Sequence, residues 1–526
     1  MRTLSIGLLF MLAFSAPGES LKFQLLTVDL QHEDQTMLFS LGGVYFADLI
    51  GGPEPELVVS NGFDGFEIWA LNQQGRKPIY QHLASIPLSA DDEAPLPQLF
   101  TFAHLSKNGK LSLVLADNAG VWHYPVAAGR FATKREQLLA LSLPGAQPLS
   151  VTYLDFALDI DGDGLDELLL PEIDKPMLWQ KPAAQGALPG TDWTPIALPG
   201  LEEKIYSSFS TFDFEVLNDT ETFPPGAVRF SNNSQTPTFY FHDYNGDGKL
   251  DLFRLLRKPL LAPDKLGPLG DQGRQASQQE RVEIDIRLFD EGRFATTATA
   301  RLEGLAPVDG NSFFTDLNGD GLLDRVEAWA NFDPVGSKSI TRFYLSQGAP
   351  TFKIAAKQDY RFNSKNPFGD NYFSDVNNDG LVDLFLLDVE YMVTDMNDIG
   401  DIIFGKKMRL TLQGYLSRNG SWPENPDVRK ALELVDFRER GMSNIMTLEH
   451  DFTGDGLADL AFASRAGRLD FYAYEKETRR FSRRKTGSCK DLGSIWTCAD
   501  LNADGLADVI SFDPADQRLI IQLSRQ

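Results

Sequence analysis

Short apolar runs, each bounded by glycine, proline, aspartate or asparagine, recur along the whole chain. They include 238–242, 312–315 and 495–498 on one side of a repeated polar segment, and 168–170, 384–387 and 509–512 on its other side. Runs of this length are too short for helices and are typical of β-strands. Helical periodicity is scarce, while 44 glycines and 29 prolines supply many turns. The pattern therefore predicts an all-β fold whose strands flank one recurring polar loop.

That polar loop is a nine-residue motif written six times, most regularly as Asp375-Val-Asn377-Asn-Asp379-Gly380-Leu-Val-Asp383. An oxygen-bearing side chain occupies positions 1, 3, 5 and 9 of every copy, and glycine occupies position 6. Only 74 of 526 residues are acidic, so composition alone does not place a carboxylate at position 9 of every copy. The candidate metal ligands are Asp159, Asp161, Asp163, Glu167, Asp243, Asn245, Asp247, Asp251, Asp316, Asn318, Asp320, Asp324, Asp375, Asn377, Asp379, Asp383, Asp451, Thr453, Asp455, Asp459, Asp500, Asn502, Asp504 and Asp508.

Alternating short oxygen ligands around a flexible glycine favour Ca²⁺, which accepts many oxygens in loose geometry. The sequence therefore predicts about six Ca²⁺ sites. An EF-hand would close with glutamate at position 12 between two helices, but only the copy that reaches Glu327 has one, and the flanks here are strand-like. Position 2 is always apolar, so we expect it to anchor each loop on a core. Each loop is predicted to join two strands of one sheet.

Two degenerate copies extend the repeat toward the N-terminus. The segment 48–56 keeps only the end residues of the motif, and 104–112 keeps the turn glycine but has no carboxylate. We expect both to retain the shape of the loop without the ion. Loop starts at 48, 104, 159, 243, 316, 375, 451 and 500 leave room for four short strands per repeat, with insertions in the longer ones.

A strand–glycine turn–aromatic unit recurs between the loops, at 121–131, 286–294, 342–352 and 414–422. Together with the loops, this unit resembles the FG-GAP or VCBS repeat found in integrin α-chain heads and in many secreted bacterial proteins. The resemblance covers nearly the whole chain after residue 20. It implies a β-propeller with an ion loop between the first and second strands of each blade. Departures from the family pattern are Glu167, Thr453, Arg325 in place of a core aliphatic residue, and the two empty loops.

Eight loops predict about eight four-stranded blades, and seven blades with one decorated repeat is the alternative. After the last loop only two strands remain, around 509–512 and 519–523. The segment 23–30 is therefore expected to supply the missing outer strand, which would join the termini and remove a free sheet edge.

The first residues read as a targeting segment. Arg2 precedes an apolar run from Leu4 to Phe14 and then small, turn-prone residues, which is typical of a secretory signal peptide. We expect 1–20 to be that signal and 21–526 to be one propeller domain, secreted, periplasmic or extracellular. No later stretch is apolar and long enough for a transmembrane helix. A net charge of −25 argues against nucleic acid and anionic membranes as partners.

The chain has two cysteines, Cys489 and Cys498. In an oxidising compartment they could form a disulfide across the turn between neighbouring strands. The alternative is a pair of buried thiols.

We find no nucleophile elbow, zinc-protease helix, Cys-x-x-Cys or phosphate-binding glycine loop. The insertions at 205–235, 260–281 and 390–406 are predicted to share the face opposite the ion loops and to build a binding surface there. Three hypotheses remain: a secreted calcium-binding module for a protein or glycan, a polysaccharide lyase or hydrolase on a calcium-stabilised propeller, and a scaffold subunit of a larger assembly.

Overall fold

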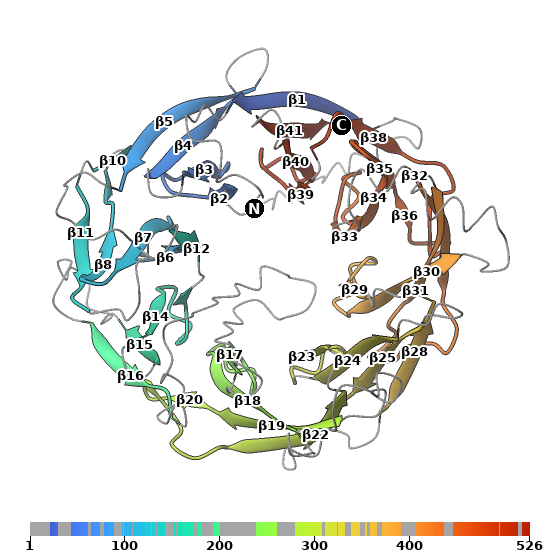
Figure 1. The fold of residues 1–526 in the computed structure, drawn as a ribbon, viewed down its shortest axis with the longest axis horizontal. Coiled ribbons are helices and arrows are strands. Elements are labelled where there is room, and N and C mark those ends of the chain that lie inside the picture. Colours follow the sequence, from blue (N-terminus) through green and yellow to red (C-terminus); the bar gives the residue numbers. More distant parts are fainter. Residues whose placement is uncertain are drawn as a thin grey trace, which may run out of the picture.

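The computed structural model arranges the chain as a ring of β-sheets (Figure 1). It describes residues 21–29, 44–61, 65–73, 78–88, 97, 99–107, 109–127, 129–132, 134–141, 151–153, 156–171, 176–180, 193–199, 238–259, 279–307, 311–322, 324–331, 338–347, 353–354, 358–365, 371–390, 407–435, 445–493, 495–513 and 518–525. These residues form strands and no helix. The expected signal segment 1–20 and nearly all of the three insertions lie outside the described residues.

Five sheets have four strands each. They are β2 (Val44–Ala47), β3 (Glu56–Ser60), β4 (Gly65–Asn72) and β5 (Ile79–Pro87); β13 (Ala157–Leu158), β14 (Glu167–Pro171), β15 (Pro176–Gln180) and β16 (Thr194–Ala197); β17 (Thr238–His242), β18 (Asp251–Pro259), β19 (Gln279–Arg287) and β22 (Ala300–Pro307); β23 (Asn311–Thr315), β24 (Asp324–Asn331), β25 (Lys338–Tyr344) and β28 (Tyr360–Ser364); and β39 (Ile495–Ala499), β40 (Asp508–Asp513) and β41 (Arg518–Arg525) with β1 (Lys22–Asp29).

Two sheets are larger. One contains β6 (Leu99–Ala103), β7 (Ser112–Asp117), β8 (Gly120–His123) and β11 (Glu136–Leu139), with β12 (Thr152–Tyr153) parallel beside β6. The other contains β29 (Asn371–Ser374), β30 (Asp383–Glu390), β31 (Lys407–Tyr415) and β32 (Val428–Val435), followed by β33 (Met446–His450), β34 (Asp459–Arg465), β35 (Arg468–Tyr472) and β38 (Gly487–Lys490). Its two halves meet at the single parallel pair Val435 and Arg465.

Four short hairpins project from the sheets. They are β9 (Val126–Ala127) with β10 (Arg130–Phe131), β20 (Phe289–Asp290) with β21 (Arg293–Phe294), β26 (Ser346–Gln347) with β27 (Lys353–Ile354), and β36 (Tyr474–Glu475) with β37 (Arg480–Phe481). Two of them carry the strand–glycine turn–aromatic units that recur in the sequence at 121–131 and 286–294.

The two ends of the chain close the ring. Strand β1 pairs antiparallel with β41 over its whole length, from Lys22 opposite Arg525 to Asp29 opposite Arg518. The prediction that the N-terminal segment supplies the outer strand of the last sheet is confirmed. Strand β41 then has a partner on both sides, and β1 becomes the outer edge strand of the last sheet. Successive sheets radiating around one centre make the fold a β-propeller (Figure 1).

Inner strands are buried on both faces because each sheet is covered by a neighbour on either side. All five residues of β3 are buried, and so are Leu168, Leu169 and Leu170 of β14. This explains why these strands read as continuous apolar runs. The outer strand β32 instead alternates buried and exposed residues.

The predicted disulfide is wrong. Cys489 lies on β38 and Cys498 on β39, which belong to different sheets and do not pair, and both thiols are free. They lie in one apolar cluster with Phe471, Trp496 and Val509. Burial raises the pKa of both thiols, so they stay protonated and pack as apolar groups. The alternative of two buried thiols is the one observed.

Candidate metal centres

All six complete loops connect the first and second strands of a four-stranded unit, as the sequence predicts. In chain order they follow β13, β17, β23, β29, β33 and β39. The apolar position-2 side chains are almost completely buried beneath the loops, which confirms their expected anchoring role. They are Ile160, Tyr244, Leu317, Val376, Phe452 and Leu501, none more than 2% exposed.

Glycine at position 6 is required by backbone conformation. The φ angles of Gly164, Gly248, Gly321, Gly380, Gly456 and Gly505 lie between 79° and 84°, in the left-handed region that other L-residues avoid. A Cβ at any of these positions would meet no atom within 4 Å. The left-handed turn, and not a shortage of space, therefore selects glycine.

The position-1 aspartate organises the turn in every complete loop. One of its carboxylate oxygens accepts the N–H of the position-6 glycine in all six, as the carboxylate of an Asx-type turn does. The pairs are Gly164 to Asp159 (2.9 Å), Gly248 to Asp243 (2.8 Å), Gly321 to Asp316 (2.8 Å), Gly380 to Asp375 (2.7 Å), Gly456 to Asp451 (2.7 Å) and Gly505 to Asp500 (2.9 Å). The loop shape is thus fixed by its own acidic side chain.

The position-9 carboxylate is buried and ties the loop to the sheet. In the loop 500–508, the N–H of Leu501 donates to one oxygen of Asp508 (2.9 Å), and the N–H of Ser524 on β41 donates to the other (2.7 Å). The same two-sided arrangement holds Asp251, Asp324 and Asp459. Sequence reasoning treated position 9 only as a metal ligand and missed this second task, which we call the clasp.

Burial strongly perturbs these carboxylates. Desolvation, opposed by the amide hydrogen bonds and increased by neighbouring loop carboxylates, raises the pKa of Glu167 to about 8 and that of Asp251 to about 6. The same causes raise the pKa values of Asp324, Asp383 and Asp459 to about 7. A cation close to such a cluster would favour the charged forms.

The loop 159–167 brings three carboxylates closest together. One oxygen each from Asp159, Asp161 and Glu167 lie within 4.8 Å of one another. Among the residues that the structure describes, no other three acidic, histidine or cysteine side chains meet that criterion. The remaining loops carry an amide or hydroxyl at position 3, and in three of them it donates to the position-5 aspartate: Asn245 to Asp247, Asn318 to Asp320 and Asn502 to Asp504, each 3.1 Å.

Two oxygens of the loop 375–383 fit a cation especially well. Asn377 Oδ1 and Asp383 Oδ2 are buried, and no donor in the described part of the chain reaches them in hydrogen-bonding geometry. A buried acceptor without a partner is costly, and a hard cation with oxygen ligands would satisfy it. The donor set of carboxylate, amide and hydroxyl oxygens suits Ca²⁺.

The two degenerate loops keep the clasp or the turn but not the ligand set. In 48–56, Glu56 accepts the N–H groups of Leu49 (2.7 Å) and Ile50 (3.1 Å). In 104–112 the lysines contact the neighbouring loops: Lys110 Nζ donates to the Ile50 carbonyl, and Lys107 Nζ lies 3.3 Å from Asp163.

Neighbouring loops are also joined through their backbones. The N–H at position 8 donates to a carbonyl of the preceding loop in four described cases: Leu111 to Asp48 (2.8 Å), Asp166 to His104 (3.0 Å), Leu250 to Ile160 (2.8 Å) and Ala507 to Asp451 (2.8 Å). The loops therefore form a connected layer on one face of the propeller.

One polar cluster outside the loops contains catalytic residue types. On β4 and β5, His82 Nε2 lies 2.5 Å from Glu67 Oε2 and 3.2 Å from Ser85 Oγ, which itself donates to Glu67 (2.8 Å). In a catalytic triad the acid and the nucleophile contact different ring nitrogens. Here one nitrogen faces both groups, so this arrangement does not support a nucleophilic serine.

Arg325, unusual for its position in the repeat, is explained by a buried polar network. Its guanidinium pairs with Glu327 and lies 4.4 Å from the centre of the Tyr344 ring. The Tyr344 hydroxyl donates to the second oxygen of Glu327 (2.6 Å). Arginine is accommodated because its charge and its planar face both find partners.

Residues 451–511 match the FG-GAP-like repeat family. Solved structures that resemble the chain include BBS1N in complex with ARL6DN, soaked with lead (10% identity, TM-score 0.29, covering 94% of this chain and 96% of that one), and the Dos1 propeller (9%, 0.35, 95% and 95%). The Photorhabdus luminescens Tc holotoxin pore is a third (12%, 0.24, 94% and 25%). No curated protein matches.

Among the described residues, no helix is long and apolar enough to cross a membrane. The chain is a β-propeller, and residues 451–511 of it contain an FG-GAP-like repeat.

Proposed function

We propose that this protein is a calcium-stabilised β-propeller that serves as a binding module for a protein or a glycan. The observation that carries the proposal is the arrangement of the six loops. In each of them a position-1 aspartate is oriented by backbone amides, and a position-9 carboxylate is buried beside it. Bound Ca²⁺ would neutralise these carboxylates and link the first two strands of each unit.

We infer eight blades. The five four-stranded sheets count as one blade each, and the five-stranded sheet counts as a blade with β12 added at its inner edge. The eight-stranded sheet divides into two, because only the Val435–Arg465 pair joins its halves and each half begins with its own ion loop.

The ligand would bind on the face opposite the ion loops. In an antiparallel unit the connection between the second and third strands leaves from the end opposite the first connection. The gaps between β18 and β19 and between β30 and β31 are two such connections, and the long insertions at 260–281 and 390–406 fall there. Long connections on a rigid scaffold commonly carry recognition.

We further propose that the chain follows the secretory route, with cleavage near residue 20. Extracellular calcium, which is often millimolar, suits loops with dissociation constants of about 10⁻⁴ to 10⁻³ M. N-terminal sequencing of the protein recovered from the medium or periplasm tests this. A mature chain that still begins at Met1 would contradict it.

The experiment that tests the binding function uses the calcium-loaded protein on arrays of extracellular proteins and glycans. A variant lacking 260–281 serves as the comparison, and its melting temperature is checked first. We expect one class of ligand to bind the intact protein and to lose affinity for the deletion variant. If no ligand on the arrays bound and calcium still raised the melting temperature, the recognition function would be contradicted. The hypothesis of a scaffold subunit would then remain.

A further inference from the structure

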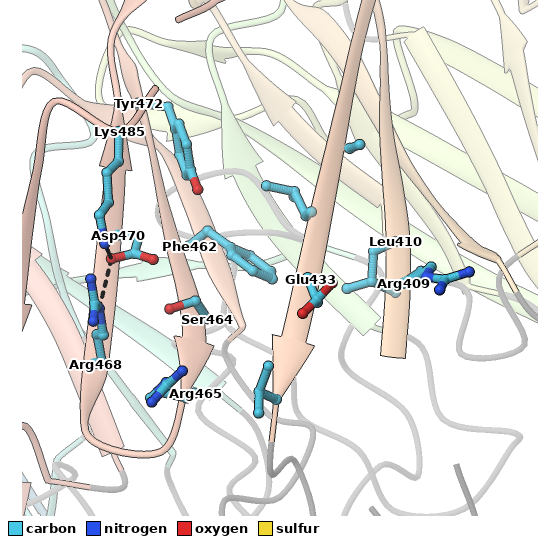
Figure 2. A pocket seen from close by; sticks show the side chains of 13 residues that line it. Arg409, Leu410, Glu433, Phe462, Ser464, Arg465, Arg468, Asp470, Tyr472 and Lys485 are labelled. Carbon is cyan, nitrogen blue, oxygen red and sulfur yellow. Dashed lines mark hydrogen bonds and ion pairs between the residues drawn. The ribbon is translucent and has the colours of Figure 1, made fainter. Parts of the chain in front are cut away.

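A cleft of about 460 Å³ lies between the two halves of the largest sheet. Strands β32 and β34 run parallel and meet at Val435 and Arg465, and Figure 2 shows Phe462 and Ser464 on one side of the gap and Glu433 on the other. The volume is within the range of about 300–1,000 Å³ typical of ligand sites. Strand β34 leaves the loop 451–459 at Asp459 and reaches the cleft at its far end, so the cleft lies toward the face opposite the six loops.

The floor of the cleft is apolar. Phe462, Leu410 and Leu432 line it and are 1%, 2% and 6% exposed, respectively. All three side chains are apolar, and the floor therefore suits an apolar side chain of a ligand.

One wall is held in place by a contact between the two halves of the sheet. The ammonium of Lys430 on β32 lies 3.9 Å from the centre of the Tyr472 ring on β35. Lys430 Nζ also donates to the carbonyls of Ser482 (2.6 Å) and Arg483 (3.2 Å). Tyr472 is therefore fixed before any ligand arrives, which lowers the entropy cost of binding.

The same wall carries polar groups that are only partly used. Asp470, 7% exposed, accepts at Oδ1 from Arg468 Nε (2.9 Å) and Lys485 Nζ (3.2 Å). Figure 2 shows its second oxygen on the side of Phe462. Ser464 and Tyr472, which both carry a hydroxyl group, also line the cleft. The wall thus offers one acceptor and several donors.

Positive charge exceeds negative charge around the cleft, although the whole chain carries −25. The lining contains four cations (Arg409, Arg465, Arg468 and Lys485) and two carboxylates (Glu433 and Asp470). Both carboxylates already have cationic partners. Lys407 lies 2.6 Å from Glu433, and Arg468 and Lys485 contact Asp470. A ligand with negative charge is therefore complementary.

We propose that this cleft binds an extended peptide segment of a partner protein, in which an apolar residue is followed by acidic residues. The apolar side chain would contact Phe462 and Leu432, and the carboxylates would lie near Arg465 and Lys485. A peptide N–H can donate to the second oxygen of Asp470, whereas a fully deprotonated anion such as sulfate has no donor. Peptide carbonyls accept from the Ser464 and Tyr472 hydroxyls. The inference rests on the proposed binding function and assigns that function a site.

The test uses the full calcium-loaded chain and three fluorescein-labelled peptides. They are Gly-Gly-Leu-Asp-Glu-Gly-Gly, its uncharged analogue with Leu-Asn-Gln, and its small analogue with Ala-Asp-Glu. Fluorescence anisotropy should show the first binding at least about tenfold more tightly than either analogue, because each analogue removes the charge or the apolar contact. Higher salt should weaken the first peptide most.

Variants locate the binding. Tyr472→Phe and Ser464→Ala each remove one hydroxyl and should weaken the first peptide about threefold to tenfold, and Lys485→Gln should weaken it similarly. Tyr360→Phe and Lys338→Gln are matched controls on another sheet and should leave the affinity unchanged. Tyr472→Phe retains the ring beneath Lys430, so its melting temperature should equal that of the parent.

Three results would overturn the proposal: equal affinity for the charged and uncharged peptides, no effect of any cleft variant, or cleft-dependent binding of trigalacturonate in place of the peptides. Failure of the wider function looks different. If the peptides fail but the protein array still gives a ligand that depends on 260–281, the binding function stands and the cleft is not its site. If nothing binds on either array, the binding function itself fails.

Discussion

The loops 500–508 and 48–56 share the loop side of the clasp, the hydrogen bond from the position-2 N–H, and differ in what surrounds it. We call the first the complete loop and the second the incomplete loop. In both, a buried carboxylate at position 9, Asp508 or Glu56, accepts the N–H of position 2. This side of the clasp is therefore retained where most of the ligand set is missing, which makes it part of the fold.

The differences fall at positions 3, 5 and 6. The complete loop has Asn502 and Asp504, where the incomplete loop has Ile50 and Gly52. Position 6 of the incomplete loop is Pro53, whose ring fixes φ near −65°, whereas glycine in the complete loop has φ 84°. The incomplete loop thus lacks both the ligands and the turn that would direct them to an ion.

The largest expected effect comes from breaking the clasp. Asp508→Ala leaves the buried amides of Leu501 and Ser524 without an acceptor, and we expect a loss of about 3 kcal/mol in the free energy of unfolding. Because the clasp acts through backbone amides, the loss should persist in EGTA. Urea denaturation with and without calcium measures it.

Glu56→Ala is the matched change in the incomplete loop and should cost a similar amount. Its effect should be independent of calcium altogether. A loss below about 1 kcal/mol in EGTA for both variants would show that the clasp does not stabilise the fold.

The loss of one calcium ion from one loop is expected to have the next largest effect on the free energy of unfolding. An ion that binds only the folded state stabilises it by about 1.4 kcal/mol when its concentration is ten times the dissociation constant. EGTA should therefore lower the melting temperature markedly, through the six complete loops. Native mass spectrometry should count six ions, and an unchanged melt would refute the metal assignment.

Asp504→Ala isolates the role of position 5. It should remove one ion from the count and lower stability by about 1 kcal/mol in calcium, while leaving the EGTA melt nearly unchanged. Gly52→Ala, at the same position of the incomplete loop, is its control: a Cβ there would come no closer than 3.8 Å to its nearest neighbour. If Gly52→Ala changed the number of bound calcium ions, the claim that only the complete loop binds an ion would be contradicted.

The local parts of this architecture follow from the sequence because they depend on residues close together in the chain. The motif predicts the turn at position 6, the buried position-2 residue and the strands on either side, and all three are found. The outer strand at 23–30 could also be predicted, since the last repeat lacked a strand.

Features that depend on distant packing could not be predicted. Whether Cys489 and Cys498 pair depends on how two separate sheets face each other. The cleft likewise combines residues of β31 and β32 with residues of β34 and β35, and its only trace in the sequence is the basic run around Lys485. The clasp was missed for a related reason, since the amide that Asp508 binds lies sixteen residues further along the chain.

The smallest expected effect tests backbone strain at position 4. Ala503 has φ 55°, while Gly454 holds the equivalent place in the loop 451–459 at φ 78°. A left-handed alanine costs about 1–2 kcal/mol. Replacing it with glycine removes this cost, but part of the gain is lost because glycine loses more conformational entropy on folding. We therefore expect Ala503→Gly to raise the free energy of unfolding by about 0.5 kcal/mol and Gly454→Ala to lower it by a similar or larger amount. Urea denaturation of both variants in EGTA separates this backbone effect from ion binding, and changes of the same sign in the two would contradict the strain argument.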